Sequence, residues 1–236
     1  MFRSICAYTA ITLYLTLGGM VIIPLSYLDP SGRSAYRLAA AWARFCVRVC
    51  GITLKSDLKT LDPSKRYIFV ANHQSQVDIP ILMALLAQFK ISFLAKHSLF
   101  AIPVLGRVMR TLGCVPIDRS NPRKALRALS QAMDQNHGTH SFVVFPEGTR
   151  NTKLGPFKPG AIIMALKSQR PIVPVVIDGS GGILPKGSWQ ITPGTVRVYG
   201  LKPIEFQGTS ALKQREALTR DLWNLMHNKL LELSNE

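Results

Sequence analysis

The sequence predicts an α/β fold with a largely parallel central sheet flanked by helices, preceded by an N-terminal helical segment of different character. Two observations predict it. From about residue 60 onward, apolar β-branched runs alternate with segments of helical pattern, which is typical of a parallel sheet covered by helices. Before them, an uncharged apolar run is followed by an arginine-rich amphipathic segment. We therefore expect the chain to divide into residues 1–50 and 51–236.

The chain is strongly basic and apolar at once. Its 236 residues hold 29 Lys and Arg against 13 Asp and Glu, a net charge of +16, and 47% are hydrophobic while 18% are charged. The mean hydropathy is positive, at +0.15. The positive charge is spread along the chain rather than collected in one run, so we expect no nucleic-acid partner. A basic and apolar protein suits a phospholipid membrane, whose surface is anionic and whose interior is hydrocarbon.

The first expected element is a long apolar helix over Ile5–Leu28, a stretch without a charged residue. At ~1.5 Å per residue it would be ~36 Å long, against ~30 Å for the hydrocarbon core of a bilayer. It could therefore span a membrane with tilt. Gly18-Gly19 and Pro24 leave a re-entrant hairpin open as the alternative. No small-residue cleavage site follows, so we expect an uncleaved, membrane-associated anchor rather than a signal peptide.

The second expected element is an amphipathic helix from Arg33 to Cys50. At ~100° per residue, four arginines share an arc of about 60°: Arg33, Arg37, Arg44 and Arg48. Four large apolar residues lie roughly opposite: Leu38, Trp42, Phe45 and Val49. This pattern predicts an interfacial helix with the arginines at lipid phosphates and Trp42 and Phe45 in the acyl boundary. The alternative is that its apolar side packs on the protein's own core.

The rest of the chain alternates strands and helices. Strands are expected in six apolar runs: Tyr67–Ala71, Ile91–Ala95, Cys114–Ile117, Ser141–Phe145, Ile172–Ile177 and Thr195–Tyr199. Helices are expected over Ile79–Gln88, Ser98–Arg110, Pro122–Gln135, Gly160–Ser168 and Ser210–Leu233. Ligands of such sheets usually bind beyond the carboxyl ends of the strands, so residues that directly follow a strand are candidates for a site.

The first of these strands runs into a turn that holds His73 and Asp78. Five residues apart, they would point ~140° from each other on one continuous helix, so they meet only if a turn separates them. A carboxylate bound to one imidazole nitrogen leaves the other free to act as a base. The alternative is that Asp78 caps the helix that begins at Ile79 and His73 is an ordinary loop residue. Spacing alone favours the cap.

Cationic residues follow two further strands. Ser141–Phe145 is followed by Glu147-Gly148-Thr149-Arg150, where Gly148 permits a tight turn and the guanidinium of Arg150 suits phosphate. Lys158 comes shortly before the helix at Gly160, and Lys96 comes just after the strand Ile91–Ala95. Together they predict an anion site at this edge of the sheet.

Four ordered segments resemble a known family. The string Asn-His-Gln-Ser-Gln-Val-Asp at 72–78 and the string Phe-Pro-Glu-Gly-Thr-Arg at 145–150 are similar to the two signature motifs of glycerolipid acyltransferases. Residues 113–119, which end in Arg119, and residues 172–177 resemble two further family blocks. Over roughly residues 60–180 the chain resembles the bacterial 1-acyl-sn-glycerol-3-phosphate acyltransferases. The resemblance favours a catalytic role for His73 and Asp78 over the helix cap.

The resemblance implies a glycerolphosphate acyltransferase-like fold and an activity. A fatty acyl group passes from acyl-CoA or acyl carrier protein to the free sn-2 hydroxyl of lysophosphatidic acid, which gives phosphatidic acid in phospholipid biosynthesis. His73 is the implied general base, oriented by Asp78. The implied substrate-binding residues centre on Arg150 for the acceptor phosphate, and the full set is Glu147, Gly148, Thr149, Arg150, Lys96, Arg119 and Lys158.

Several expectations complete this interpretation. Residues 51–236 become a catalytic acyltransferase domain and residues 1–50 its membrane anchor, on the cytoplasmic face of a bacterial inner membrane. We expect no metal and no cofactor, because a thioester donor carries its own activation and the four cysteines lack metal-binding spacing.

Three alternatives stay open. One is the same chemistry on another acceptor, such as a lyso-ornithine lipid, another lysophospholipid or glycerol 3-phosphate. The second is an acyl-enzyme formed on Ser75, and the third is a basic membrane scaffold without catalysis.

Overall fold

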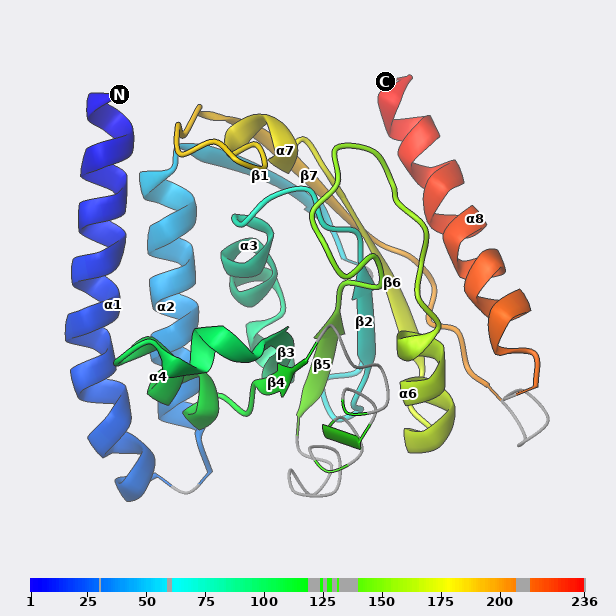
Figure 1. The fold of residues 1–236 in the computed structure, drawn as a ribbon, viewed down its shortest axis with the longest axis horizontal. Helices are drawn as coiled ribbons and strands as arrows, with labels where there is room; N and C mark the ends of the chain where they lie inside the picture. The colour runs from blue at the N-terminus through cyan, green and yellow to red at the C-terminus, as the bar shows by residue number, and fades with distance from the viewer. Residues whose placement is uncertain are drawn as a thin grey trace.

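The protein is built on a seven-stranded sheet with helices on both faces (Figure 1). The computed structural model describes residues 1–29, 31–58, 61–118, 124, 127–128, 131, 140–206 and 213–235. The strand order is β1-β7-β6-β2-β5-β3-β4, and only the β6–β7 pair is antiparallel. The strands are β1 (Ile52–Asp57), β2 (Ile68–Ala71), β3 (Ile91–Lys96), β4 (Val115–Ile117), β5 (Ser141–Val144), β6 (Ile172–Asp178) and β7 (Gly194–Gly200). The predicted fold class, a largely parallel sheet flanked by helices, is confirmed.

The central strands are apolar along their whole length because both faces of the sheet are covered. Every residue of β2 and β5 is buried, and β2 pairs with β5 and β6 on its two sides. Alternate residues of β2 belong to different clusters, with Phe69 on one face and Ile68 on the other. This explains why these strands appear in the sequence as continuous apolar runs rather than as alternating patterns.

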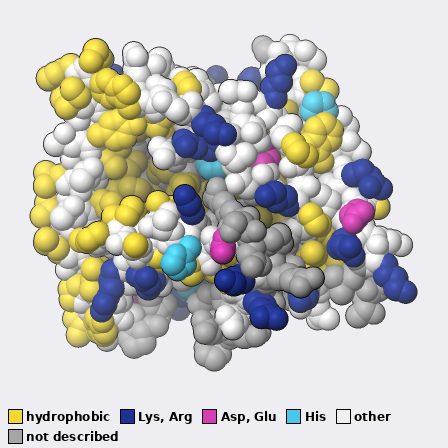
Figure 2. All heavy atoms as spheres, in the orientation of Figure 1, with side chains coloured by type: hydrophobic (Ala, Val, Ile, Leu, Met, Phe, Trp, Pro, Cys, Tyr) yellow, Lys and Arg dark blue, Asp and Glu magenta, His cyan; other side chains and the backbone are white. Residues whose placement is uncertain are grey.

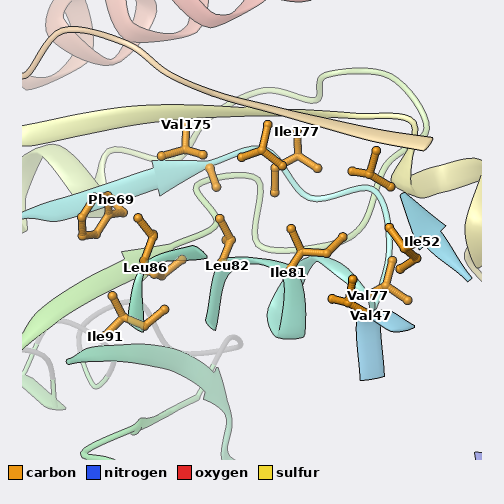
Figure 3. Close-up of a cluster of buried hydrophobic side chains, with 14 of the residues drawn as sticks. Val47, Ile52, Phe69, Val77, Ile81, Leu82, Leu86, Ile91, Val175 and Ile177 are labelled. Carbon is orange, nitrogen blue, oxygen red and sulfur yellow. The ribbon is translucent and has the colours of Figure 1, made fainter. Parts of the chain in front are cut away.

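Each face is covered by its own helices. On one face, α3 (Asp78–Leu85) turns Ile81 and Leu82 toward Phe69 and Ile177 (Figure 3). On the other, α6 (Gly160–Ser168) and α8 (Arg215–Ser234) contribute Met164 and Met226. The 3₁₀ turn η1 (Ala87–Phe89) continues α3, and the one-turn helix α7 (Ser180–Ile183) precedes β7. The predicted helix Pro122–Gln135 lies largely outside the described residues.

The structure differs from the sequence prediction at two elements, one helix and one strand. The helix expected over Ser98–Arg110 is broken into η2 (His97–Ala101) and α4 (Leu105–Thr111). Pro103 has no amide hydrogen to continue the ladder, and Val104 takes a φ of +61°. Strand β1 was not predicted, because only its first residue is buried and it therefore lacks an apolar run. It pairs with β7 alone, at the edge of the sheet.

The N-terminal segment is a pair of antiparallel helices side by side (Figure 1). α1 (Phe2–Leu28) is one continuous helix, long and apolar enough by length and composition to cross a membrane. The alternative of a re-entrant hairpin inside Ile5–Leu28 is therefore not seen, and the chain reverses between α1 and α2 instead. Gly19 serves close packing, because a Cβ there would clash with a methyl carbon of Val104. The predicted domain boundary at residue 50 stays a prediction, since Ala7 joins the apolar cluster of the sheet.

α2 (Arg33–Val49) has the predicted amphipathic pattern but a different apolar partner. Its four arginines are exposed. Phe45, by contrast, stacks on Tyr14 of α1 with ring centroids 4.9 Å apart, and the indole nitrogen of Trp42 is buried without a hydrogen-bond partner. Both aromatic residues are half-buried inside the protein, which is the alternative in which the apolar side packs on the protein itself.

The exposed apolar surface belongs to α1 instead. Large side chains are exposed along its whole length: Phe2, Ile5, Leu13, Leu17, Met20, Val21, Tyr27 and Leu28. Figure 2 shows hydrophobic side chains along this edge of the molecule. The exposed apolar surface of the N-terminal pair therefore comes from α1, whereas α2 exposes its arginines.

Candidate active site

The residues after β2 form a turn that wraps around one carboxylate. Asn72 fixes the end of the strand, because its side-chain amide bonds both the carbonyl oxygen and the amide nitrogen of Ile177 at 2.8 Å. Asp78 follows as the first residue of α3. Its Oδ2 accepts the backbone N–H groups of Gln74 and Ser75 at 2.9 and 2.8 Å. The turn that the spacing of His73 and Asp78 required is present.

His73 and Asp78 form a dyad in this turn. The Nδ1 of His73 lies 2.8 Å from the Oδ2 of Asp78, whose side chain is fully buried. With Asp78 ionised, Nδ1–H donates to the carboxylate, and Nε2 keeps a lone pair that can take a proton. The imidazole ring also stacks on Phe145, with centroids 4.0 Å apart. Asp78 thus closes the turn and lies against His73, and its carboxylate bonds N–H groups that precede α3 rather than capping the helix.

Glu147 has a different place from the one predicted. It was grouped with the substrate-binding residues, but its carboxylate is buried and occupied by the protein itself. Oε1 accepts the backbone N–H of His73 at 2.9 Å, and Oε2 accepts the side-chain amide of Asn151 at 2.6 Å and the N–H of Gly155 at 2.9 Å. Glu147 therefore ties the loop after β5 to the His73 turn rather than facing a ligand. Sequence spacing alone offered no signal of this contact.

Three of the remaining predicted residues, Lys96, Arg150 and Lys158, add positive charge at the edge of the sheet where the His73 turn lies. Gly148 adopts a φ of +71°, and the ammonium of Lys158 lies 3.3 Å from where a Cβ would be. Arg150 is half-exposed in the same loop, and the exposed Lys96 ends β3 at the same edge of the sheet. Figure 2 shows Lys and Arg side chains with a His at this face. Arg119 lies outside the described residues, so its predicted role stays a prediction.

Two residues near the dyad have roles that the sequence did not specify. Lys186 donates to the Thr149 hydroxyl at 3.2 Å. With Lys96, Arg150 and Lys158 it forms the basic rim of the site. Ser75 is fully buried and donates its hydroxyl to the carbonyl of Leu184 at 2.8 Å. A buried hydroxyl committed to a carbonyl suits a structural role better than a nucleophile.

An apolar cavity of about 540 Å³ opens beside the dyad. It begins at Gln76 and Ile79, next to the His73 turn, and extends to Leu17 and Val21 on the exposed side of α1. Figure 2 shows the hollow lined with hydrophobic side chains, next to the basic rim. Its volume is in the range of ligand pockets. The sequence did not predict it, because its walls come from α1, α2, α3, β3 and α4, which only the tertiary fold brings together.

The arrangement suits a particular kind of ligand. An apolar cavity next to a basic rim can hold an amphiphile with an anionic head and a hydrocarbon tail. A hydroxyl at the junction of head and tail would then lie near His73, which can act as a base toward it. Among the described residues, no group of three or more His, Cys, Asp or Glu side chains is placed to hold a metal ion.

Comparison with known proteins agrees with this geometry. The family model described as Acyltransferase matches residues 53–178. A chloroplastic 1-acyl-sn-glycerol-3-phosphate acyltransferase of Brassica napus is 42% identical over 157 residues, which are 64% of this chain and 45% of the relative. The 1-acyl-sn-glycerol-3-phosphate acyltransferase of Haemophilus influenzae is 32% identical over 174 residues, 72% of this chain and 71% of the relative. The chain thus spans less than half the length of the plant relative.

A solved structure is similar over the whole chain. The crystal structure of the 1-acyl-sn-glycerophosphate (LPA) acyltransferase PlsC from Thermotoga maritima has a TM-score of 0.84 and 26% sequence identity, and the match covers 100% of this chain and 96% of that one. The fold and the family model thus agree on the class of protein. The chain belongs to the Acyltransferase family and, within it, to the 1-acyl-sn-glycerol-3-phosphate acyltransferases, as its four sequence segments predicted.

Proposed function

We propose that the protein transfers a fatty acyl group from a thioester donor to the sn-2 hydroxyl of lysophosphatidic acid and so makes phosphatidic acid. The observation that carries the proposal is the His73–Asp78 pair, joined at 2.8 Å, in a turn whose Gln76 lines the apolar cavity. The names of the curated relatives support the same acceptor.

The proposed mechanism uses the dyad as a general base and then as an acid. The Nε2 of His73 takes the proton of the sn-2 hydroxyl while the oxygen attacks the thioester carbonyl. Asp78 stabilises the imidazolium that forms. The tetrahedral intermediate collapses, the carbon–sulfur bond breaks, and the imidazolium returns its proton to the departing thiolate. The thioester supplies the activation of the acyl group.

Recognition of the acceptor is divided between charge and hydrocarbon. Arg150 presents a planar fork of donors that matches a phosphate, and Lys158, Lys96 and Arg119 add positive charge. The cavity beside Gln76 and Ile79 takes the acyl chain, which places the hydroxyl of a lysophospholipid near His73.

The membrane is part of this proposal. α1 lies along α2, as the stacking of Tyr14 on Phe45 shows, so a bilayer crossed by α1 would also submerge the exposed arginines of α2. Each would cost ~2.5–3.5 kcal/mol or more near the bilayer centre. We therefore place α1 in the plane of the interface, with its exposed apolar side in the acyl boundary and Arg33, Arg37, Arg44 and Arg48 at lipid phosphates. For a bacterial chain, the surface is the cytoplasmic face of the inner membrane, where soluble acyl-CoA and acyl carrier protein have access.

A reconstituted assay tests the function. Purified protein is mixed with vesicles that contain lysophosphatidic acid, another lysophospholipid or a lyso-ornithine lipid, or with glycerol 3-phosphate in solution, and each acceptor is given acyl-CoA or acyl carrier protein. We expect phosphatidic acid as the main product, identified by chromatography and mass spectrometry. Faster acylation of another acceptor would reassign the substrate, and no acylation of any acceptor would favour the scaffold. Ser75→Ala should keep its turnover, whereas its loss would favour an acyl-enzyme.

A further inference from the structure

A short exposed loop between α7 and β7 carries a large aromatic side chain. Its six residues, Pro185 to Gln190, are all exposed, and Trp189 keeps 48% of its surface open to solvent. The family model ends at residue 178, before this loop, and the site described above uses only Lys186 of it. Tryptophan joins a large apolar ring to a hydrogen-bond donor, which is why it is enriched at interfaces and in membrane-interface belts.

The loop is attached at both ends to parts of the molecule already described. Just after it, the N–H of the buried Ile191 donates to the hydroxyl of Ser4 in the first turn of α1, at 3.0 Å. Near its start, the ammonium of Lys186 donates to the Thr149 hydroxyl at 3.2 Å, beside the active site. The loop therefore bridges the rim of the site and the N-terminal end of α1. In Figure 1 it lies at the end of the molecule that holds the N-terminus.

The surface next to it on α1 is apolar and open. Met1, Phe2 and Ile5 are 77%, 82% and 54% exposed, and Arg3 is the charged side chain among them. Trp189 lies in the loop that joins this end of α1 to the rim of the site, and Lys186 in the same loop adds a second cation. Tryptophan with lysine and arginine is the combination found at the boundary between headgroups and acyl chains.

The loop is built to present Trp189 at low entropic cost. The N–H of Ser188 donates to the carbonyl of Pro185 at 3.0 Å, and the Ser188 hydroxyl accepts the N–H of Gln190 at 3.0 Å. Gly187 takes a φ of +86°, which a side chain would strain. The tryptophan is therefore held outward by a closed turn.

We propose that the loop Pro185–Gln190 is a second membrane-binding element, in which Trp189 inserts into the headgroup boundary of an anionic phospholipid bilayer. This inference rests on the proposed interfacial placement of α1 and deepens it. Membrane contacts through α1 and through the loop beside the rim of the site would hold the opening of the cavity against the lipid surface. The net charge of +16 favours an anionic surface as the partner.

Depth-dependent fluorescence tests the insertion directly. The chain has three tryptophans, so the double variant Trp42→Phe/Trp223→Phe reports on Trp189 alone. With vesicles of phosphatidylglycerol and phosphatidylethanolamine that carry brominated acyl chains, we expect a blue shift and quenching of its emission. The matched control is Trp42→Phe/Trp189→Phe, which keeps only Trp223; that residue bonds the Gly155 carbonyl from α8 and should not be quenched. Vesicle co-sedimentation is measured on the same samples.

The possible outcomes distinguish membrane binding by the loop from membrane binding by α1. Protein that sediments with vesicles while Trp189 stays unquenched would overturn the role of the loop and leave that of α1 intact. Protein that does not sediment at all would overturn both. Quenching of Trp189 by added acyl carrier protein, without quenching by brominated vesicles, would reassign the loop to a protein partner and also overturn the proposal.

A substitution measures the size of the effect. Trp189→Ala should weaken vesicle partitioning about tenfold, since half of a large aromatic surface is lost from the contact. Its apparent KM for vesicle-borne acceptor should rise by a similar factor, while kcat with a short-chain, water-soluble acceptor stays unchanged. The control Leu225→Ala removes a side chain that is 42% exposed on α8 and should change neither value. Equal partitioning of Trp189→Ala and the unsubstituted protein would contradict the proposal.

Discussion

The His73 turn and the basic rim of the site are built in opposite ways. In the turn, the carboxylates of Asp78 and Glu147 are buried and bonded to named donors at 2.6–2.9 Å. On the rim, Lys96 and Lys186 are exposed and Arg150 is half-exposed. Under the proposed mechanism, the difference means that the fold preorganises the chemical step, whereas the side chains that would bind the anionic headgroup keep much of their hydration. Substitutions in the turn should therefore reduce kcat, and substitutions on the rim should mainly raise KM.

The largest effect is expected for Asp78→Asn. An amide preserves the shape of the side chain but removes the charge that stabilises the imidazolium and fixes the Nδ1–H tautomer. We expect kcat to fall about 10²- to 10⁴-fold with little change in KM. Steady-state kinetics on lysophosphatidic acid vesicles measures the split. A variant that lost affinity instead of turnover would show that Asp78 belongs to recognition.

Substitutions of Arg150 are expected to have a smaller effect, and to raise KM rather than lower kcat. Arg150→Lys keeps the charge but loses the bidentate fork, and Arg150→Ala loses both. We expect KM for lysophosphatidic acid to rise about tenfold in the lysine variant and further in the alanine variant, with kcat changed less. Should kcat collapse while KM stays constant, the division between turn and rim would be wrong.

Substitution of Glu147 tests whether the stability of the His73 turn depends on the hydrogen bonds of this carboxylate. In Glu147→Gln, the new amide group replaces an oxygen that accepts from protein N–H donors, so at least one buried donor loses its partner. This should lower the free energy of unfolding by about 1–3 kcal/mol and reduce kcat. The matched control is Glu216→Gln on α8, whose side chain is 72% exposed, with an expected change within about 0.5 kcal/mol. Urea unfolding measures both, and equal stabilities would remove the structural role of Glu147.

The smallest effect on activity is expected at the opposite end of the sheet. His140 precedes β5, and its Nδ1 lies 3.0 Å from the hydroxyl of Ser92 and 3.3 Å from that of Tyr36. Burial, with the charges of Lys90, Arg66 and Arg170, lowers the pKa of His140 to about 4. The unfolded chain, with a histidine pKa of about 6.5, then binds more protons than the native protein, so stability falls as the pH drops from about 6.5 to about 4.

His140→Gln isolates this contribution. Its free energy of unfolding should depend less on pH between 7 and 5 than that of the unsubstituted protein, and its turnover at pH 7 should be nearly unchanged. Denaturant titrations at both pH values measure the difference. If the unfolding free energies of the variant and the unsubstituted protein fell equally between pH 7 and pH 5, His140 would not be the group that causes the loss of stability.

The sequence predicted the buried parts of this molecule better than the exposed and composite ones. β2 and β5 are buried on both faces, so their apolar runs were recognisable, and the motif residues follow them directly. β1 lies at the sheet edge with one buried residue, and the interruption at Val104 depends on packing against α1.

The site shows the same limit of local information. The spacing of His73 and Asp78 required a turn, and the structure has it. The internal bonds of Glu147 and the cavity, which is lined by several separate elements, depend on contacts between distant parts of the chain, which no local pattern encodes. The amphipathic pattern of α2 was correct, yet pattern alone could not distinguish a bilayer from α1 as the partner of Phe45.

The most direct test of the account is single-turnover acyl transfer by His73→Ala at saturating lysophosphatidic acid and acyl thioester. Loss of the base should slow the chemical step by at least about 10²-fold, while co-sedimentation with acceptor-containing vesicles and the unfolding midpoint stay close to those of the unsubstituted protein. Transfer by His73→Ala within a few-fold of the unsubstituted rate would contradict the central claim.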